Sequence, residues 1–309
     1  MVSVIMLTYN RESWIEKMIS DILGQSFPDF EFIIVNNGST DGTGVLLSKF
    51  AGADSRIRVI TLERAQTIGR GRNVGLRHAA GEFVAYVDDD DRVSEDFLGF
   101  LVDLQKECNA DIAMCGADEK LNGRWGPQCM FEDKYILSGR EAVTELLKRE
   151  RIRAGTPAKL FRKTLLEKFP FDEEARSEDI HTMYKYFAEA DKVILHGLPK
   201  YHFIRHGRNN SIFTSDFSKL TPEMLEEYLE VYRERADYLT EKYPEDKEFF
   251  EYTVWSFMIS MCGKIEKNEV ASCAGPLRKM KDCLRREQAA LFESQYVTLE
   301  EKMELQRMG

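Results

Sequence analysis

Residues 81–91 read Gly-Glu-Phe-Val-Ala-Tyr-Val-Asp-Asp-Asp-Asp, which places four consecutive carboxylates directly after a short apolar run. The run Phe83–Val87 has the composition of a buried strand. Carboxylates held together at a strand end repel one another, and a divalent cation relieves that repulsion. Asp88 and Asp90 would lie on one side of an extended chain, because side chains alternate. The alternative interpretation is a solvated acidic loop before a helix capped by Ser94.

Strands and helices alternate on both sides of this stretch. Apolar runs predict strands, and apolar residues at helical spacing predict the helices between them. The expected strands are 2–7, 30–35, 57–62, 83–87 and 111–115, and the expected helices are 13–23, 41–50, 69–80 and 94–107. Strands separated by helices of this length form βαβ units. The fold class is therefore α/β, with a mostly parallel, Rossmann-like sheet and flanking helices.

The chain after residue 115 is less regular. Residues 116–137 contain glycines and a proline that predict hairpins or loops. Ser138 and Glu141 form a capping box, so a helix is expected from there to about residue 149. Two short strands are expected at 159–162 and 192–195, around a helix at 179–190.

The last third of the sequence reads as helices. Thr221-Pro222 is a helix start with proline at the first helical position, and Thr298 and Glu301 form another capping box. Helices are expected at 221–242, 245–267, 276–292 and 298–307. We therefore predict an α/β domain of residues 1–214 and a helical C-terminal domain or arm of residues 215–309.

Composition narrows the class of protein. The 309 residues carry 43 Lys and Arg against 53 Asp and Glu, and the net charge of −10 works against general binding of nucleic acid or anionic membranes. A hydrophobic share of 43% fits a soluble globular protein. The six cysteines include no Cys-x-x-Cys pair, which indicates reduced thiols. Since no signal peptide or transmembrane segment is evident, a cytoplasmic protein is expected.

Polar residues follow each of the first four expected strands. In an open α/β sheet, ligands bind beyond the carboxyl ends of the strands. Four successive polar loops at one edge therefore predict a site for a polar, anionic ligand. These residues are Thr8, Tyr9, Asn10 and Arg11 after the first strand, Asn36, Asn37 and Asp41 after the second, Arg70, Arg72 and Asn73 after the third, and Asp88–Asp91 after the fourth.

Residues 1–115 resemble a family-2 glycosyltransferase, a family with the GT-A fold and an inverting reaction. The matching segments are Val2-Ser-Val-Ile-Met-Leu-Thr-Tyr-Asn10, Ile34-Val-Asn-Asn-Gly-Ser-Thr-Asp-Gly-Thr43, Gly71-Arg-Asn-Val-Gly75 and residues 81–91, in the family's order and spacing. A looser resemblance extends to about residue 212 through Lys159-Leu-Phe-Arg162, Ser177-Glu-Asp179 and Ser211-Ile212. It says little about residues 215–309.

The resemblance implies roles for individual residues. Asp88 and Asp90 would be the Asp-x-Asp pair that holds Mn²⁺ or Mg²⁺, with Asp90 as the direct ligand. Asp179 would be the general base and Glu178 the reserve candidate, although acids after Ser177 are also typical of an ordinary helix start. The implied donor-binding residues are Thr8, Tyr9, Asn37, Asp41, Arg72, Asn73, Asp88, Asp89, His206 and Arg208. A solvated basic loop over 200–208 is the alternative for the last two.

The function implied by the resemblance is an inverting, metal-dependent glycosyltransferase. Its donor would be a nucleotide-diphosphate sugar, UDP-linked, and its acceptor a hydroxyl of a glycan or lipid-linked acceptor in surface polysaccharide or glycoconjugate synthesis. Family members often carry Asp where this chain has Asn37, which leaves the contact with uracil open. No nucleic-acid partner is implied. Peripheral association with the inner face of the membrane and oligomer formation stay open.

Two other functions are weighed against this one. A nucleotidylyltransferase shares the sheet architecture but carries a Gly-rich basic loop after the first strand, where this chain has Thr8-Tyr-Asn-Arg-Glu12. A non-catalytic nucleotide-sugar-binding assembly protein would act through the helical tail, and intact acidic pairs disfavour it. The apolar residues of that tail indicate buried packing, with an acceptor wall, a dimer face or a docking surface as alternatives.

Overall fold

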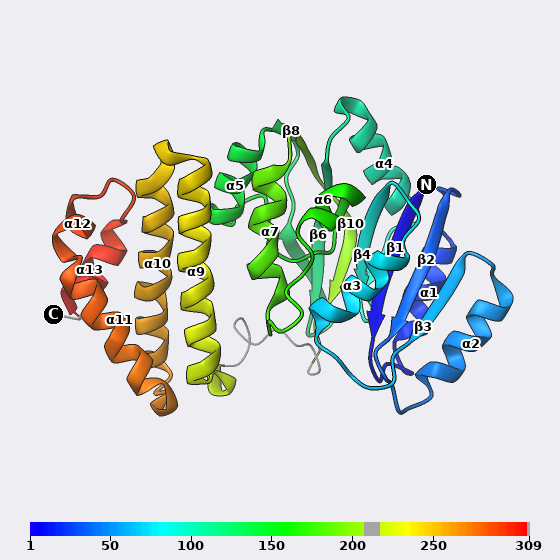
Figure 1. Ribbon diagram of the computed structural model, residues 1–309, viewed down its shortest axis with the longest axis horizontal. Coiled ribbons are helices and arrows are strands. Elements are labelled where there is room, and N and C mark those ends of the chain that lie inside the picture. Colours follow the sequence, from blue (N-terminus) through cyan, green and yellow to red (C-terminus); the bar gives the residue numbers. More distant parts are fainter. Residues whose placement is uncertain (207–216, 308–309) are drawn as a thin grey trace. The chain divides into compact units, whose positions relative to one another are not determined.

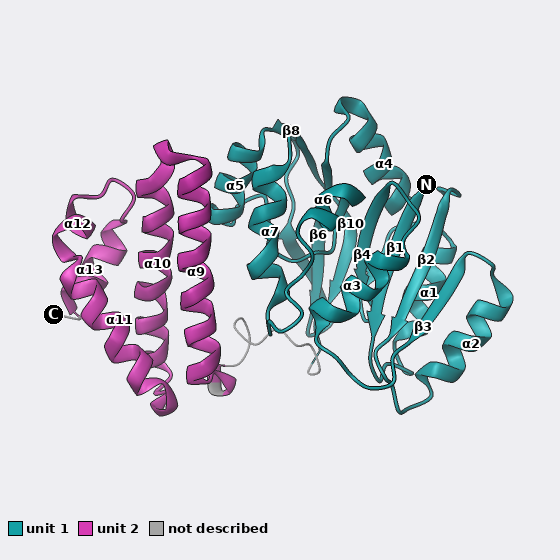
Figure 2. Ribbon diagram, viewed as in Figure 1, with its two compact units in different colours: residues 1–207 teal, residues 208–309 magenta. Residues whose placement is uncertain are grey.

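The computed structural model describes residues 1–206 and 217–307 and divides the chain into two compact units, residues 1–207 and 208–309 (Figure 2). The predicted boundary between residues 214 and 215 falls outside the described residues. The predicted site residue Arg208 and the Ser211-Ile212 landmark also lie outside them.

Unit 1 is built on one mixed sheet (Figure 1), with strand order β3-β2-β1-β4-β9-β6-β10-β5, while β7 pairs with β6 and β8 with β10. Its described strands are β1 (Val2–Thr8), β2 (Phe30–Asn36), β3 (Ile57–Thr61), β4 (Phe83–Asp88), β5 (Arg92–Val93), β6 (Ile112–Leu121), β7 (Arg124–Cys129), β8 (Lys134–Leu137), β9 (Lys159–Arg162) and β10 (Val193–Ile204). The pairs β1–β2, β1–β4, β2–β3 and β6–β10 are parallel. The short strands β5, β7, β8 and β9 pair antiparallel. The predicted α/β class is confirmed.

Apart from the short helix Lys163–Lys168, which the sequence did not predict, the described helices of unit 1 begin and end within three residues of the predicted positions. They are α1 (Ile15–Leu23), α2 (Thr43–Ala53), α3 (Ile68–His78), α4 (Phe97–Cys108), α5 (Gly139–Lys148), α6 (Lys163–Lys168) and α7 (Glu178–Glu189). The capping box of Ser138 and Glu141 is present. The predicted cap at Ser94 is wrong, because α4 begins three residues later and the Ser94 hydroxyl bonds to the His202 ring instead.

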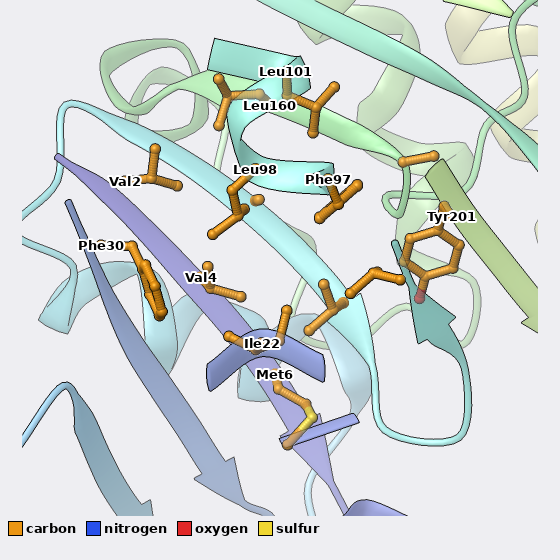
Figure 3. Packing of buried hydrophobic residues seen from close by; sticks show 14 of the residues in the cluster. Val2, Val4, Met6, Ile22, Phe30, Phe97, Leu98, Leu101, Leu160 and Tyr201 are labelled. Atoms are coloured by element: carbon orange, nitrogen blue, oxygen red, sulfur yellow. The ribbon is translucent and has the colours of Figure 1, made fainter. Parts of the chain in front are cut away.

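One face of the sheet packs on α1 and α4. Alternate residues of β1 (Val2, Val4 and Met6) join apolar residues of α1 and α4 in a core cluster (Figure 3). Ala85 of β4 and Tyr201 of β10 belong to the same cluster. We call this the α1/α4 face.

The opposite face of the sheet packs on α3 and α7. A Cβ added at Gly71 or Gly75 of α3 would come within 2.4 Å of Leu7 or Ile5 of β1, so glycine lets this helix lie close to the strand. The Tyr186 ring of α7 contacts Phe161 of β9, with ring centroids 5.7 Å apart. We call this the α3/α7 face.

Strands β6 and β10 are longer than the sequence indicates. The predicted strands 111–115 and 192–195 cover only the beginnings of β6 and β10, which continue to Leu121 and Ile204. Their second halves pair with each other, from Ala117 with Tyr201 to Lys120 with Ile204. Asp118, Glu119 and Lys120 follow one another in β6, and Lys200 and His202 interrupt β10, so neither half has the continuous apolar run by which a buried strand is found.

The described secondary structure of unit 2 is all helical. Its elements are η1 (Phe217–Lys219), α9 (Pro222–Lys242), η2 (Pro244–Asp246), α10 (Lys247–Lys267), η3 (Ala271–Cys273), α11 (Ala274–Arg286), α12 (Gln288–Glu293) and α13 (Leu299–Arg307). The predicted helix 276–292 is two helices, which meet at Glu287. Thr221 caps α9, and Thr298 and Glu301 form the predicted capping box.

Most apolar side chains of α9 and α10 pack inside unit 2, as the sequence indicates, whereas Leu299 and Met303 of α13 are exposed. Val231 and Tyr232 of α9 and Met258, Ile259 and Met261 of α10 are buried. The Tyr232 ring lies 4.2 Å, centroid to centroid, from Phe257. No helix among the described residues of either unit has the length and apolar character needed to cross a membrane.

Candidate active site

Arg72 of α3 joins the end of β4 to the start of α7. Its guanidinium forms an ion pair with Glu178, and its Nη2 lies 3.3 Å from the Asp88 carboxylate. Burial opposes the positive charge, but Glu178 and Asp88 outweigh it, so the pKa of Arg72 is raised. The guanidinium carbon also lies 5.8 Å from the centre of the Tyr86 ring and 5.7 Å from that of Phe171. Three predicted site residues are thus brought together on the α3/α7 face.

Glu178 and Asp179 form the first turn of α7. Glu178 is buried, and burial raises its pKa although Arg72 opposes the shift. Burial likewise raises the pKa of Asp179, again against the effect of Arg72, and its Oδ1 accepts a hydrogen bond from the Ile180 amide at 2.8 Å. The Ser177 side chain makes no capping hydrogen bond to this helix. Raising the pKa of a carboxylate makes its ionised form a stronger proton acceptor.

The acidic run 88–91 is mostly buried, so the solvated-loop interpretation is wrong. Asp89 is 7% exposed, and burial raises its pKa to about 7 although Arg11 opposes the shift. Arg11 Nε donates to Asp89 at 3.2 Å, and Arg11 Nη2 lies 3.5 Å from Asp90. The Asp88 side chain is the open member of the run, with 41% of its surface exposed. The run therefore combines internally paired carboxylates with one that faces solvent.

Asp90 and the end of the described part of unit 1 meet at His206. The His206 Nε2 lies 2.9 Å from Asp90 Oδ2, and its ring stacks on Trp14 with centroids 4.3 Å apart. The sequence predicted His206 as a site residue, and the structure places it beside the proposed metal ligand. The Trp14 contact was not predicted, because the two residues lie 192 positions apart in the chain and no local pattern joins them.

Asp91 holds the end of β10 rather than facing the site. Its carboxylate accepts hydrogen bonds from the Tyr201 hydroxyl at 2.9 Å and from the Ile204 amide at 2.8 Å. Tyr201 Oη in turn accepts a hydrogen bond from the Asp88 amide at 3.0 Å. Asp91 and Tyr201 thereby fix the backbone from which Asp88 and Asp90 project.

Two of the predicted donor-binding residues use their side-chain amides in hydrogen bonds to the backbone of other segments. The Asn37 side chain donates to the Gln66 carbonyl and accepts from the Gln66 amide, both at 2.9 Å. The Asn73 side chain donates to the Phe171 carbonyl at 2.8 Å and accepts from its amide at 3.0 Å. Asn73 thus holds the backbone at Phe171, and Asn37 fixes the loop after β3.

The remaining predicted residues lie at the ends of β1 and β2. Thr8 is buried, whereas Tyr9 is 45% exposed. The Asp41 carboxylate accepts hydrogen bonds from the amides of Thr43 at 3.0 Å and Glu12 at 3.3 Å. Burial opposes ionisation of Asp41, but the hydrogen bonds from Thr43 prevail and lower its pKa. Tyr9 is therefore the ring at this edge that is open to a planar ligand.

The alternative of a solvated basic loop over 200–208 is wrong in the described part, where residues 200–204 belong to β10 and the charged side chains are paired. Lys200 pairs with Asp96, His202 with Asp118, and Arg205 with Glu119. These pairs hold β10 against its neighbours.

Comparison with known proteins gives the same assignment as the motifs. Residues 3–167, more than half of the chain, match the family described as Glycosyl transferase family 2. The chain belongs to this family. Glycosyltransferase GlyA from Streptococcus pneumoniae is 28% identical over 225 residues, which are 69% of this chain and 32% of GlyA. The chain therefore spans about a third of that relative.

A second family-2 relative has been solved as a crystal structure. The poly(ribitol-phosphate) beta-N-acetylglucosaminyltransferase TarS from Staphylococcus aureus is 32% identical over 191 residues, covering 60% of this chain and 32% of TarS. The structure of TarS 1–349 in complex with UDP superposes with a TM-score of 0.66 at 27% identity, over 81% of this chain and 69% of that one. The two share the GT-A fold.

The acidic residues fit a divalent cation that is also held by its substrate. No group of three His, Cys, Asp or Glu side chains arranged to hold a metal ion is found in residues 1–206 and 217–307. Mg²⁺ takes one or two protein carboxylates and completes its shell with water and substrate phosphates. The exposed Asp88 and the neighbouring Asp90 suit that mode and not an all-protein cage. In this family-2 chain, Asp88 and Asp90 are the residues that would hold such an ion.

The sequence did not assign a role to Arg11 or to Tyr201. Arg11 is one of the polar residues that follow the first strand, but its pairing with Asp89 spans 78 positions of the sequence. Tyr201 lies in a strand whose second half was not recognised. Both act on the acidic run through contacts between elements that are distant in sequence.

Proposed function

We propose that this family-2 protein is an inverting glycosyltransferase that moves a sugar from a nucleotide-diphosphate donor to a hydroxyl acceptor. The observation that carries the proposal is the pairing of Arg72 with Glu178 and Asp88. It brings the carboxylates at the end of β4 and those at the start of α7 to one place on the α3/α7 face. The chemistry needs carboxylates that hold a cation beside the diphosphate and a further carboxylate that takes the proton of the acceptor hydroxyl.

The donor we propose is UDP-linked. This choice is supported by structures of a relative that shares the fold: TarS 1–349 has been solved in complex with UDP and with UDP-GlcNAc. The base would lie against the exposed Tyr9 ring at the end of β1, because an open aromatic face stacks on a planar base. Asn37, with both ends of its amide used on Gln66, would shape this pocket through the backbone of the loop after β3.

The reaction would be a single displacement. A divalent cation, Mn²⁺ or Mg²⁺, would supply Lewis-acid stabilisation of the charge that develops on the leaving diphosphate. Asp88 and Asp90 would hold it, and Arg72 keeps Asp88 in position. Asp179 would accept the proton of the acceptor hydroxyl as that oxygen attacks the anomeric carbon. One base and no covalent intermediate suffice, so the anomeric configuration inverts.

We propose the acceptor and the cellular process from the same similarity to TarS. The hydroxyl would belong to a glycan or a lipid-linked acceptor, in the synthesis of a surface polysaccharide or related glycoconjugate. The name of TarS describes transfer of N-acetylglucosamine to a polymer of ribitol phosphate, which supports a polymeric acceptor. We propose that the protein acts in the cytoplasm, where nucleotide sugars would be available to it.

The test is UDP release from UDP-GlcNAc with and without Mn²⁺, for the wild type, Asp90→Asn and Asp96→Asn. Mn²⁺ should stimulate the wild type, and loss of the direct ligand should cost about 100-fold or more. Asp96 is exposed and pairs with Lys200, so its substitution is a matched control that should leave the rate unchanged. Full activity of Asp90→Asn would contradict the metal role. Tight UDP-GlcNAc binding without turnover would indicate a non-catalytic binding protein.

A further inference from the structure

The hairpin of β6 and β7 rises past the edge of the sheet where the acidic run lies. Leu160 of β9 pairs with Ala85 of β4 on one side and with Ala113 of β6 on the other, so these residues are level across the sheet. β4 ends three residues later at Asp88, level with Gly116, whereas β6 continues to Leu121. At about 3.3 Å per residue, β6 extends roughly 16 Å beyond the end of β4.

Alternation along β6 shows which face of this hairpin is turned toward the candidate base. Ala113, Cys115 and Ala117 all belong to the core on the α1/α4 face. Asp118 and Lys120 therefore lie on the α3/α7 face, the face of Arg72, Asp88 and Glu178. Trp125 of β7 pairs directly with Lys120 and shares that face.

Trp125 is an exposed aromatic ring held in place by its neighbours. The residue is 54% exposed. The Lys120 ammonium lies 5.6 Å from the ring centre, and the His202 ring meets it edge-on with centroids 5.8 Å apart. His202 is itself fixed by hydrogen-bonding contacts with Asp118 at 2.7 Å and Ser94 at 3.0 Å. A ring so constrained loses little freedom when a ligand settles on it.

The position of Trp125 separates it from the donor side of the site. Lys120 pairs with Trp125 on one side and with Ile204 on the other, and the Ile204 amide donates to Asp91. Trp125 is thus about two strand spacings, roughly 10 Å, from Ile204. The proposed nucleotide pocket lies across β4 from this hairpin, at the ends of β1 and β2. If the donor occupies that pocket, a second substrate would reach Asp179 from the side of the β6–β7 hairpin.

We propose that Trp125 is the platform on which a sugar ring of the acceptor rests. This inference rests on the proposed function and names its acceptor as a glycan with a pyranose ring near the reacting hydroxyl. The C–H face of a pyranose is apolar and packs on an aromatic face, while its hydroxyls accept hydrogen bonds from ammonium groups and donate them to carboxylates at the ring edge. Lys120 and Asp118, on the same face of the hairpin, are groups of that kind.

The test compares Trp125→Ala, Trp125→Phe and Leu121→Ala with the wild type. Leu121 is the matched control, because it lies on the same hairpin at 53% exposure and alternation places it on the α1/α4 face. The probes are p-nitrophenyl pyranosides as acceptors, with UDP-GlcNAc and Mn²⁺. Their binding to the UDP-loaded protein is followed by saturation-transfer NMR, and transfer by product formation.

We expect Trp125→Ala to raise the KM for the pyranoside, or to weaken its binding, about tenfold, the value of a good aromatic contact. Trp125→Phe should recover part of this loss, and Leu121→Ala should show none. The affinity for UDP and the hydrolysis of UDP-GlcNAc by water should stay at wild-type level in all three variants, because the donor side is untouched.

Three results would overturn the inference. One is an unchanged pyranoside affinity in Trp125→Ala, and another is an equal loss in Leu121→Ala. The third is failure of every pyranoside to bind the wild type while ribitol phosphate binds, which would indicate a polyol-phosphate acceptor. In each case, retained UDP binding and donor hydrolysis would leave the proposed function standing. If the wild type itself neither bound UDP nor hydrolysed UDP-GlcNAc, the proposed function would be refuted instead.

Discussion

Two groups of polar residues at the carboxyl edge of the sheet use their atoms in different ways. The amide pair, Asn37 and Asn73, hydrogen-bonds to backbone amides and carbonyls of distant loops. The charge cluster, Arg72, Asp88, Glu178 and Asp179, consists of ionisable side chains that face one another. Changes in the first group should therefore act on stability, and changes in the second on both stability and chemistry.

The largest effect is expected for Asp179→Asn. If Asp179 takes the proton of the acceptor hydroxyl, this change should lower kcat by about 10²–10⁴-fold, the usual contribution of a general base. The Kd for UDP should stay close to that of the wild type, since the substitution keeps size and leaves the β1–β4 side alone. Steady-state kinetics and calorimetry measure the two quantities. Asp172→Asn, at an exposed carboxylate, is the control. Loss of donor binding in Asp179→Asn would show that this carboxylate binds the donor.

Arg72→Gln should have the next largest effect. It leaves the buried Glu178 without its cation, and breaking a buried ion pair costs about 3–5 kcal/mol of unfolding free energy. Urea denaturation measures this loss. The double variant Arg72→Gln/Glu178→Gln removes the uncompensated charge and should recover much of the stability. A single variant as stable as the wild type would mean that the pair contributes nothing to the fold.

Lys159 combines features of both groups. It is an ionisable side chain, and its buried ammonium hydrogen-bonds to backbone carbonyls. It is 2% exposed, its Nζ donates to the carbonyls of Gly155 and Pro157, and burial lowers its pKa to about 8. The unfolded chain then binds more protons between pH 8 and about 10.4, so the free energy of unfolding should rise with pH across that window.

The rise attributable to Lys159 should reach about 3 kcal/mol at its upper limit. Denaturation curves for the wild type and Lys159→Met, recorded from pH 7 to pH 10.5, isolate it as the difference between the two proteins. Below pH 8 that difference should be constant. A difference that falls as pH rises would contradict the assigned direction of the shift.

The smallest effect is expected in the amide pair. Asn73→Ala removes both hydrogen bonds to Phe171 and leaves its backbone groups unpaired in a buried place, at a cost of about 2 kcal/mol. Turnover per folded molecule should stay near the wild-type level, because no ionisable group of the charge cluster changes. Chemical denaturation and kinetics on the same samples decide the matter. A large fall in kcat with unchanged stability would place Asn73 in the chemistry after all.

Much of the fold can be predicted because its signals are local. The apolar runs of β1–β4, the capping boxes at Ser138 and Thr298, and the proline start of α9 each depend on neighbouring residues. The same holds for the order of the family-2 segments in the first part of the chain. Such features report the backbone conformation of a few residues, and short stretches of sequence contain that information.

The partners of the site residues depend on contacts that no short stretch contains. The bond from Asn73 to Phe171 spans 98 positions, and the pairing of Arg72 with Glu178 spans 106. The second halves of β6 and β10 exist as strands because they pair with each other, and their polar residues hide them from a search for apolar runs. The sequence alone predicts an α/β sheet with acidic residues at one edge. Which of those acids are buried, which stays open and which cation faces each of them follows from packing, because charge pairing and burial depend on distance in space and not on distance along the chain.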